Sequence, residues 1–155
     1  MANQMCKITA EASVGAVPTM GLGRVATTGN VYYVDSNTGE STYSGLSPDA
    51  PLDTFSNALS LCTSNKGDII LFMPGHAETL TANTEISVEG LTIMGLGVGD
   101  NRATFTFGTS TDADWEVKAD NVWIDNIVFK NAIDNQKSII TSIKAYTKIT
   151  NCLFL

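Results

Sequence analysis

The sequence predicts an all-β fold, a short right-handed parallel β-helix with an amino-terminal arm and one capping helix. The composition is the first indication: 43% hydrophobic and only 16% charged residues, with many small turn-forming ones, suit strands and turns better than a helical bundle. The second is the run GDIILFMPG at 67–75, a continuous apolar segment between turn residues, typical of a strand covered on both faces. The third is a short pattern that occurs three times after it.

Length, charge and cysteine content limit the class of protein. A chain of 155 residues can bury one core without a metal or disulfides. Its net charge of −7 argues against nucleic acid or an anionic membrane as a partner. The three cysteines, Cys6, Cys62 and Cys152, form no CxxC pair and are interpreted as free thiols. We therefore expect no metal and no cofactor.

The amino-terminal region predicts neither a signal peptide nor a membrane span. Glu11 interrupts the only candidate apolar stretch, and no window approaches the roughly twenty apolar residues that cross a bilayer. Residues 1–30, with Lys7 and Arg24, show no sustained period, which predicts an extended arm lying against its own domain or a neighbour. A disordered terminus is the alternative. Residues 31–155 predict the β-helix domain, which we expect to continue or to be covered beyond its last residue.

The first elements of the domain are a strand, a loop and a helix. The run VYYVD at 31–35 predicts a strand that ends at the turn cluster 36–39. Pro48 and Pro51 then exclude a regular ladder from the following loop. A helix is predicted over 54–62, capped by Asp53 or Thr54 and ended by 65–67, with one apolar face made of Phe55, Ala58, Leu59 and Cys62.

The segments 91–96, 122–127 and 148–152 each place Gly or Asn between apolar residues. The shared positions are Gly95, Asn126 and Asn151, which are 31 and 25 residues apart. This irregular period is within the range of solenoid coils with variable loops. We expect Asn126 and Asn151 to adopt a left-handed backbone at a corner while their amides pair along the stack. An antiparallel sandwich is the alternative.

A family resemblance agrees with this interpretation. The runs 31–62 and 66–80 resemble the opening of pectate-lyase-like right-handed β-helix proteins, and 90–97 with Asn101 and Arg102 resembles the following coil in proteins of tailed bacteriophages. The likeness covers roughly residues 31–130 and implies either a polysaccharide lyase or hydrolase, or a non-catalytic virion protein. Its matching positions are Asp35, Gly45, Ser47, Pro48, Pro51, the helix 54–62, Gly67, Asp68, Pro74 and Gly75.

Carboxylates are the first candidates for chemistry, since a hydrolase needs two of them about 5 to 10 Å apart. Asp112 and Asp114 would share a face on a strand, but the surrounding TSTDAD favours a solvated turn. Asp125 and Asp134 follow in later coils. No basic cluster accompanies these residues, so we assign no catalytic residue.

The only histidine, His76, lies two residues from Glu78, but spacing indicates no third ligand for a metal. A corner histidine bonded to the backbone or to Glu78 is the favoured interpretation. Arg102 could act as a lyase base by analogy or could cap a carbonyl. Gly95, Gly97 and Gly99 lack the Lys-Ser/Thr pair of a phosphate loop. No cofactor-binding or metal site is assigned.

The favoured function is a non-enzymatic structural component of a phage virion surface, a head-decoration or fibre protein attached through residues 1–30. We expect a homo-oligomer that binds the capsid or another virion protein, and the resemblance implies a trimer. The apolar residues 152–155 would need a cover. The alternative is the amino-terminal part of a tailspike depolymerase, for which a glycan would be a partner. A carbohydrate-binding module would need exposed aromatics, whereas Trp115 and Trp123 are expected in the core.

Overall fold

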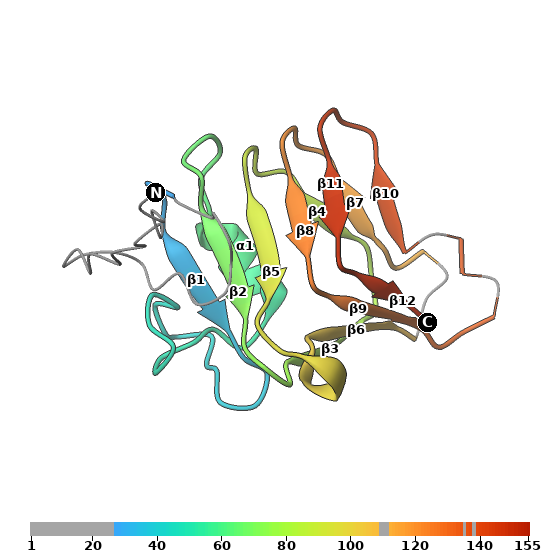
Figure 1. The fold of residues 1–155 in the computed structure, drawn as a ribbon, viewed down its shortest axis with the longest axis horizontal. Helices are drawn as coiled ribbons and strands as arrows, with labels where there is room; N and C mark the ends of the chain where they lie inside the picture. The colour runs from blue at the N-terminus through green and yellow to red at the C-terminus, as the bar shows by residue number, and fades with distance from the viewer. Residues whose placement is uncertain (1–26, 109–111, 135, 138) are drawn as a thin grey trace, which may run out of the picture.

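The computed structural model of the protein describes residues 27–108, 112–134, 136–137 and 139–155 (Figure 1). Within these residues the chain is mostly β-strand, with one α-helix and one short 3-10 turn. Of the predicted arm 1–30, only residues 27–30 are among those described. No helix in the described part has the length and apolar character needed to cross a membrane.

The strands form three parallel sheets, so the all-β prediction is confirmed and the antiparallel sandwich is wrong. The first sheet has the order β1-β2-β5-β8-β11, the second β12-β9-β6-β3 and the third β10-β7-β4. The first comprises β1 Val31–Val34, β2 Ile69–Phe72, β5 Thr92–Gly95, β8 Trp123–Asp125 and β11 Lys148–Thr150. The other two comprise β3 Ala77–Leu80, β6 Thr104–Phe107, β9 Val128–Asn131 and β12 Leu153–Phe154, and β4 Thr84–Ile86, β7 Trp115–Val117 and β10 Ile140–Ser142.

The predicted central strand and repeats occupy neighbouring places in the first sheet. β2 lies between β1 and β5, and all four of its residues are buried, as the continuous apolar run predicted. The three repeats become β5, β8 and β11, which pair so that Thr92, Trp123 and Lys148 are aligned. Segments far apart in sequence therefore pair through backbone hydrogen bonds at equivalent positions.

Asn126 and Asn151 have φ values of 58° and 52°, which confirms the predicted left-handed backbone. Their amides do not pair with each other, contrary to expectation. The Asn126 amide donates to the Gly95 and Gly97 carbonyls at 2.7 and 2.9 Å, and the Asn151 amide donates to the Asp125 carboxylate at 2.8 Å. Each amide finds an acceptor at the preceding bend or on its neighbouring strand, so no amide partner is required.

A second column of left-handed residues went unpredicted. Four residues with φ between 58° and 77° stand two positions before the strands β2, β5, β8 and β11. This column sets the direction in which the chain enters each strand of the first sheet. Its members are Gly67, Gly90, Asn121 and Tyr146.

The helix α1, Phe55–Leu61, begins close to its predicted start. Thr54 is the N-cap, and its hydroxyl accepts from the Asn57 N–H at 3.3 Å. Phe55 and Ala58 are fully buried, while Leu59 and Cys62 pack partly buried against the same core, which confirms the predicted apolar face. The helix ends at Leu61, with Cys62 as the C-cap, earlier than expected.

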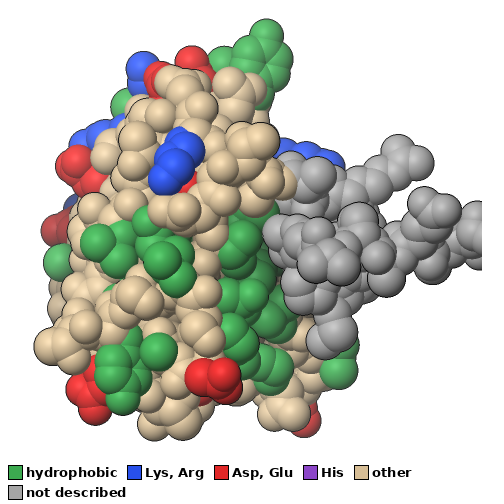
Figure 2. Space-filling model, turned by 90° about the vertical axis from the view of Figure 1, so that its left-hand side faces the viewer, with side chains coloured by type: hydrophobic (Ala, Val, Ile, Leu, Met, Phe, Trp, Pro, Cys, Tyr) green, Lys and Arg blue, Asp and Glu red, His purple; other side chains and the backbone are tan. Residues whose placement is uncertain are grey.

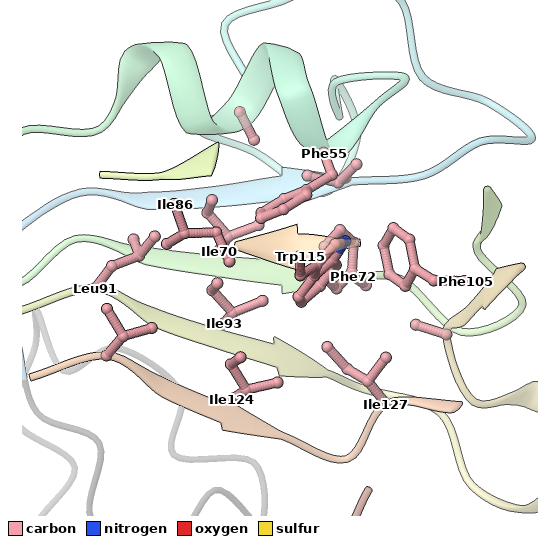
Figure 3. Packing of buried hydrophobic residues seen from close by; sticks show 14 of the residues in the cluster. Phe55, Ile70, Phe72, Ile86, Leu91, Ile93, Phe105, Trp115, Ile124 and Ile127 are labelled. Atoms are coloured by element: carbon pink, nitrogen blue, oxygen red, sulfur yellow. The ribbon is translucent and has the colours of Figure 1, made fainter. Parts of the chain in front are cut away.

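Aromatic rings fill the space between the sheets (Figure 3). Phe55 stacks on Trp115 with ring centroids 4.5 Å apart, and Phe105 meets both Phe72 and Trp115 edge to face at 5.0 and 4.7 Å. Such contacts add about 0.5–1.5 kcal/mol each beyond area burial. The helix and all three sheets thus share one core.

Candidate interaction surfaces

The His76 corner is a structural site. The ring is fully buried, stacks on Phe72 with centroids 4.8 Å apart, and accepts from the Ser36 N–H at 3.0 Å through Nδ1. Since Nδ1 accepts, the proton of a neutral ring is assigned to Nε2, which faces Glu78 Oε2 at 3.4 Å. The same carboxylate oxygen accepts from the Phe55 N–H at 3.0 Å. The predicted corner histidine is confirmed, and it joins three separate segments.

The candidate carboxylates lie in different surroundings. Asp112 is exposed in a turn and pairs with Lys137, as expected for a solvated residue. Asp114 is only 8% exposed and accepts from the Thr141 hydroxyl at 2.9 Å, so a solvated position is wrong for this residue. Its backbone carbonyl accepts from the Thr84 N–H at 2.8 Å, which draws it into the third sheet.

The other two carboxylates belong elsewhere. Asp125 lies on β8 of the first sheet and accepts from the Thr150 hydroxyl and the Asn151 amide. Asp134 is exposed in the segment after β9. Asp114 and Asp125 each bond a side chain on or beside the adjacent strand, which is a structural use of a carboxylate. Three of the four carboxylates thus bond to a neighbouring side chain: Asp112 to Lys137, Asp114 to Thr141 and Asp125 to Thr150.

Arg102 caps carbonyl groups, one of the two alternatives left by the sequence. Its guanidinium donates to the Ile127 carbonyl at 3.4 Å and to the Asn151 carbonyl. Gly95 and Gly97 precede the 3-10 turn η1, Gly99–Asn101, and Gly99 begins it. A Cβ at Gly97 would collide with the backbone of Asn101, so this glycine closes the turn on itself.

The thiols and the possible metal ligands are dispersed. Cys62 and Cys152 are free and half-buried, while Cys6 lies outside the described residues. Burial, with the charge of Asp68 adding to it, raises the pKa of the Cys62 thiol to about 12. Burial also raises the pKa of Cys152. Among the residues described, no three His, Cys, Asp or Glu side chains gather in a way that could hold a metal ion.

An apolar patch on the outside of the first sheet was not predicted. It centres on Ile69, Leu71 and Met94, which form a cluster separate from the main core. Trp123 belongs to its border and is half-buried, with the Lys148 ammonium 4.4 Å from its ring centroid, so the core position expected for this residue is wrong. Trp115 is in the core as expected. We call this surface the outer apolar patch; its members are Val31, Tyr33, Ile69, Leu71, Met94, Leu96 and Trp123.

A second apolar surface lies at the β11–β12 end of the sheets. Leu153, Phe154 and Leu155 are 43%, 50% and 60% exposed, as predicted for this segment, although Cys152 is half-buried. Ile149 of β11 adds a side chain that is 41% exposed. Phe154 stacks on Phe129 with ring centroids 5.2 Å apart, and Phe129 contacts Trp115 of the core at 5.2 Å, so Phe154 extends the aromatic cluster of the core. We call Ile149, Leu153, Phe154 and Leu155 the carboxy-terminal edge.

A shallow hollow of about 230 Å³ adjoins this edge on the outside of the second sheet. Asp100 and Lys130 stand on its wall with Thr104, Val128, Leu153 and Leu155. Its mixed lining provides no cluster of convergent polar groups of the kind that orients a small ligand. The two apolar surfaces are therefore the stronger candidates for function.

Comparison of the chain with protein-family models, with curated proteins and with solved structures finds no match.

Proposed function

We propose that the chain is a right-handed parallel β-helix with a structural role on the surface of a phage particle, as a head-decoration or fibre protein. The order of the strands supports the fold. β2, β3 and β4 enter the first, second and third sheets in turn, as do β5, β6 and β7 and then β8, β9 and β10. Parallel strands joined by crossovers of this kind are almost always right-handed.

The carboxy-terminal edge is the observation that carries the assembly role. Leu153 and Phe154 of β12 are in register with the buried Val128 and Phe129 of β9. Ile149 of β11 is likewise in register with the buried Ile124 of β8. In the carboxy-terminal edge the corresponding side chains are exposed. Another layer of strands would bury these side chains and pair the outer backbone groups of β11 and β12. That layer can come from a further stretch of the same polypeptide or from a neighbouring copy, and we propose the copy.

Residues 1–30 supply the proposed attachment to the capsid or another virion protein, and the trimeric state is proposed from the resemblance to phage proteins. The carboxylates at the predicted positions do not favour the alternative of a tailspike depolymerase. Asp114 and Asp125 bond to neighbouring strands, and Asp112 pairs with a lysine. A scaffold whose polar groups are used to hold strands together suits a structural role.

Light scattering on the full chain tests the assembly. Leu155→Asp places a charge on the carboxy-terminal edge, and Leu46→Asp is its matched control, because Leu46 is 54% exposed in a loop far from that edge in sequence. We expect a trimer that the first substitution dissociates and the second leaves intact. A monomer at every concentration, or equal dissociation by both variants, would contradict the proposal. Cryo-electron microscopy of the particle then locates the subunit.

A further inference from the structure

The outer face of the first sheet changes character along the stack. Two rows of side chains point away from the main core, one on each side of the inward row. Both rows are apolar over β1 and β2 and become polar toward β11. In register, the first row reads Val31, Ile69, Thr92, Trp123 and Lys148, and the second reads Tyr33, Leu71, Met94, Asp125 and Thr150.

The polar half of this face is suited to water, whereas the apolar half is shielded. Ile69, Leu71 and Met94 are 4%, 6% and 2% exposed. α1 does not lie over them, because its Phe55 and Ala58 enter the main core on the other side of the sheet. Figure 2 shows that further hydrophobic side chains form a band on the β1 end of the stack.

The chain enters the domain beside this patch. The Thr27 hydroxyl donates to the Gly67 carbonyl, and the Asn30 N–H donates to the Asp68 carboxylate at 2.6 Å. Gly29 allows the close approach, because a Cβ there would lie 2.6 Å from the Asp68 backbone nitrogen. Residues 27–30 are thereby fixed at the start of β1 and β2, where the apolar half of the face begins.

We propose that residues 1–26 of the same chain pack on the outer apolar patch. The span from β1 to β8 is about 15 Å at a strand spacing near 4.8 Å, which about five extended residues can cross. The segment has ample length and offers Val14, Val17, Met20, Leu22 and Val25 for burial. Its contact ends where Lys148 covers Trp123 and the face turns polar.

The chain's own segment is favoured over a second copy as the occupant. A segment tethered at residue 27 acts at an effective concentration of about millimolar, which a separate molecule in dilute solution does not reach. Its Lys7 and Arg24 outnumber its single acidic residue, Glu11, whereas the rest of the chain is net negative, so the two parts are opposite in sign. This packing does not depend on the proposed virion role. If residues 1–30 also attach the protein to a particle, they do so while residues 1–26 are packed on the outer apolar patch.

The test uses the methyl groups of methionine in the full chain. The protein has five methionines, among which Met94 lies in the patch and Met73 lies half-buried just after β2. With ¹³C-methyl methionine and a soluble nitroxide, we expect the Met94 methyl to be shielded in the wild type. The double variant Met20→Asp/Leu22→Asp should raise its relaxation enhancement several-fold. Asn3→Asp/Gln4→Asp, which adds the same charge without removing an apolar side chain, should not.

Three results would overturn the inference: a Met94 methyl that the nitroxide reaches in the wild type, one that stays shielded in the Met20→Asp/Leu22→Asp chain, or shielding that disappears on dilution and so comes from a second copy. An unchanged Met73 signal and unchanged emission from the buried Trp115 verify that each variant is folded. The oligomeric state measured on Leu155→Asp is a separate readout, so failure of this inference does not decide the proposed function.

Discussion

Asn126 is the residue at which the contributions of backbone and side chain can be separated. It adopts a left-handed backbone with φ 58° and its amide donates to two carbonyls at 2.7 and 2.9 Å. Asn121 is a matched position with the same φ of 58°. Its exposed side chain forms no hydrogen bond to any of the residues described. Substituting each asparagine by alanine and by glycine gives four variants.

The expected losses follow from these contacts. Losing two amide hydrogen bonds lowers the free energy of unfolding by about 2 kcal/mol, at about 1 kcal/mol each. An alanine held in the left-handed region adds about 1 kcal/mol, which glycine avoids. Asn126→Ala should therefore cost about 3 kcal/mol and Asn126→Gly about 2 kcal/mol. At Asn121 the corresponding losses should be about 1 kcal/mol and close to zero.

Urea unfolding followed by circular dichroism measures the loss of unfolding free energy in all four variants. An m value equal to that of the wild type establishes that each variant exposes the same surface on unfolding. Equal losses for the two alanine variants would refute the assignment of stabilising bonds to the Asn126 amide. Equal losses for alanine and glycine at position 126 would refute the backbone contribution. Either result would mean that this corner is held by the strands on each side of it.

Two further predictions concern a glycine and a thiol. Gly95→Ala places a Cβ 2.5 Å from the Asn126 carbonyl oxygen and should lower the free energy of unfolding by about 1–3 kcal/mol in the same assay. Gly108→Ala, whose nearest neighbour would be 3.7 Å away, should have little effect; similar losses would contradict the steric argument. The pKa of Cys62 rises from 9.0 to about 12 on folding, so the folded state retains a proton that the unfolded state loses, and stability should fall as pH rises across this window. Cys62→Ala should flatten that fall, and an unchanged slope would show that the thiol is not responsible.

The sequence predicted the elements whose signals are local. β2 follows from a continuous apolar run, and α1 follows from its spacing and the Thr54 cap. The repeated Gly or Asn positions predicted which strands become neighbours in the first sheet. At Asn126 and Asn151 even the backbone conformation was predictable, because asparagine tolerates the left-handed region.

The remaining features depend on contacts between distant segments. Side chains alternate along a strand, so Trp123 points outward once Ile124 is known to point inward. The sequence alone does not say which of these two residues points into the core. The Ser36 N–H that His76 accepts from comes from 40 residues away. Tyr146 adopts φ 60° without any residue preference to signal it. The strands of the third sheet are three residues long, too short for a periodic pattern.

The order of the first sheet determines how the protein responds to force. β1 and β11 are its two edge strands, and they lie at opposite ends of the stack in Figure 1. Tension between residue 31 and Leu155 acts across the strands, so it loads the hydrogen bonds of an edge strand before those of the centre. Each detachment releases one loop and its strands, and the chain lengthens in steps. A subunit held at both ends would yield gradually and absorb work, with the central strand β5 the last of this sheet to separate.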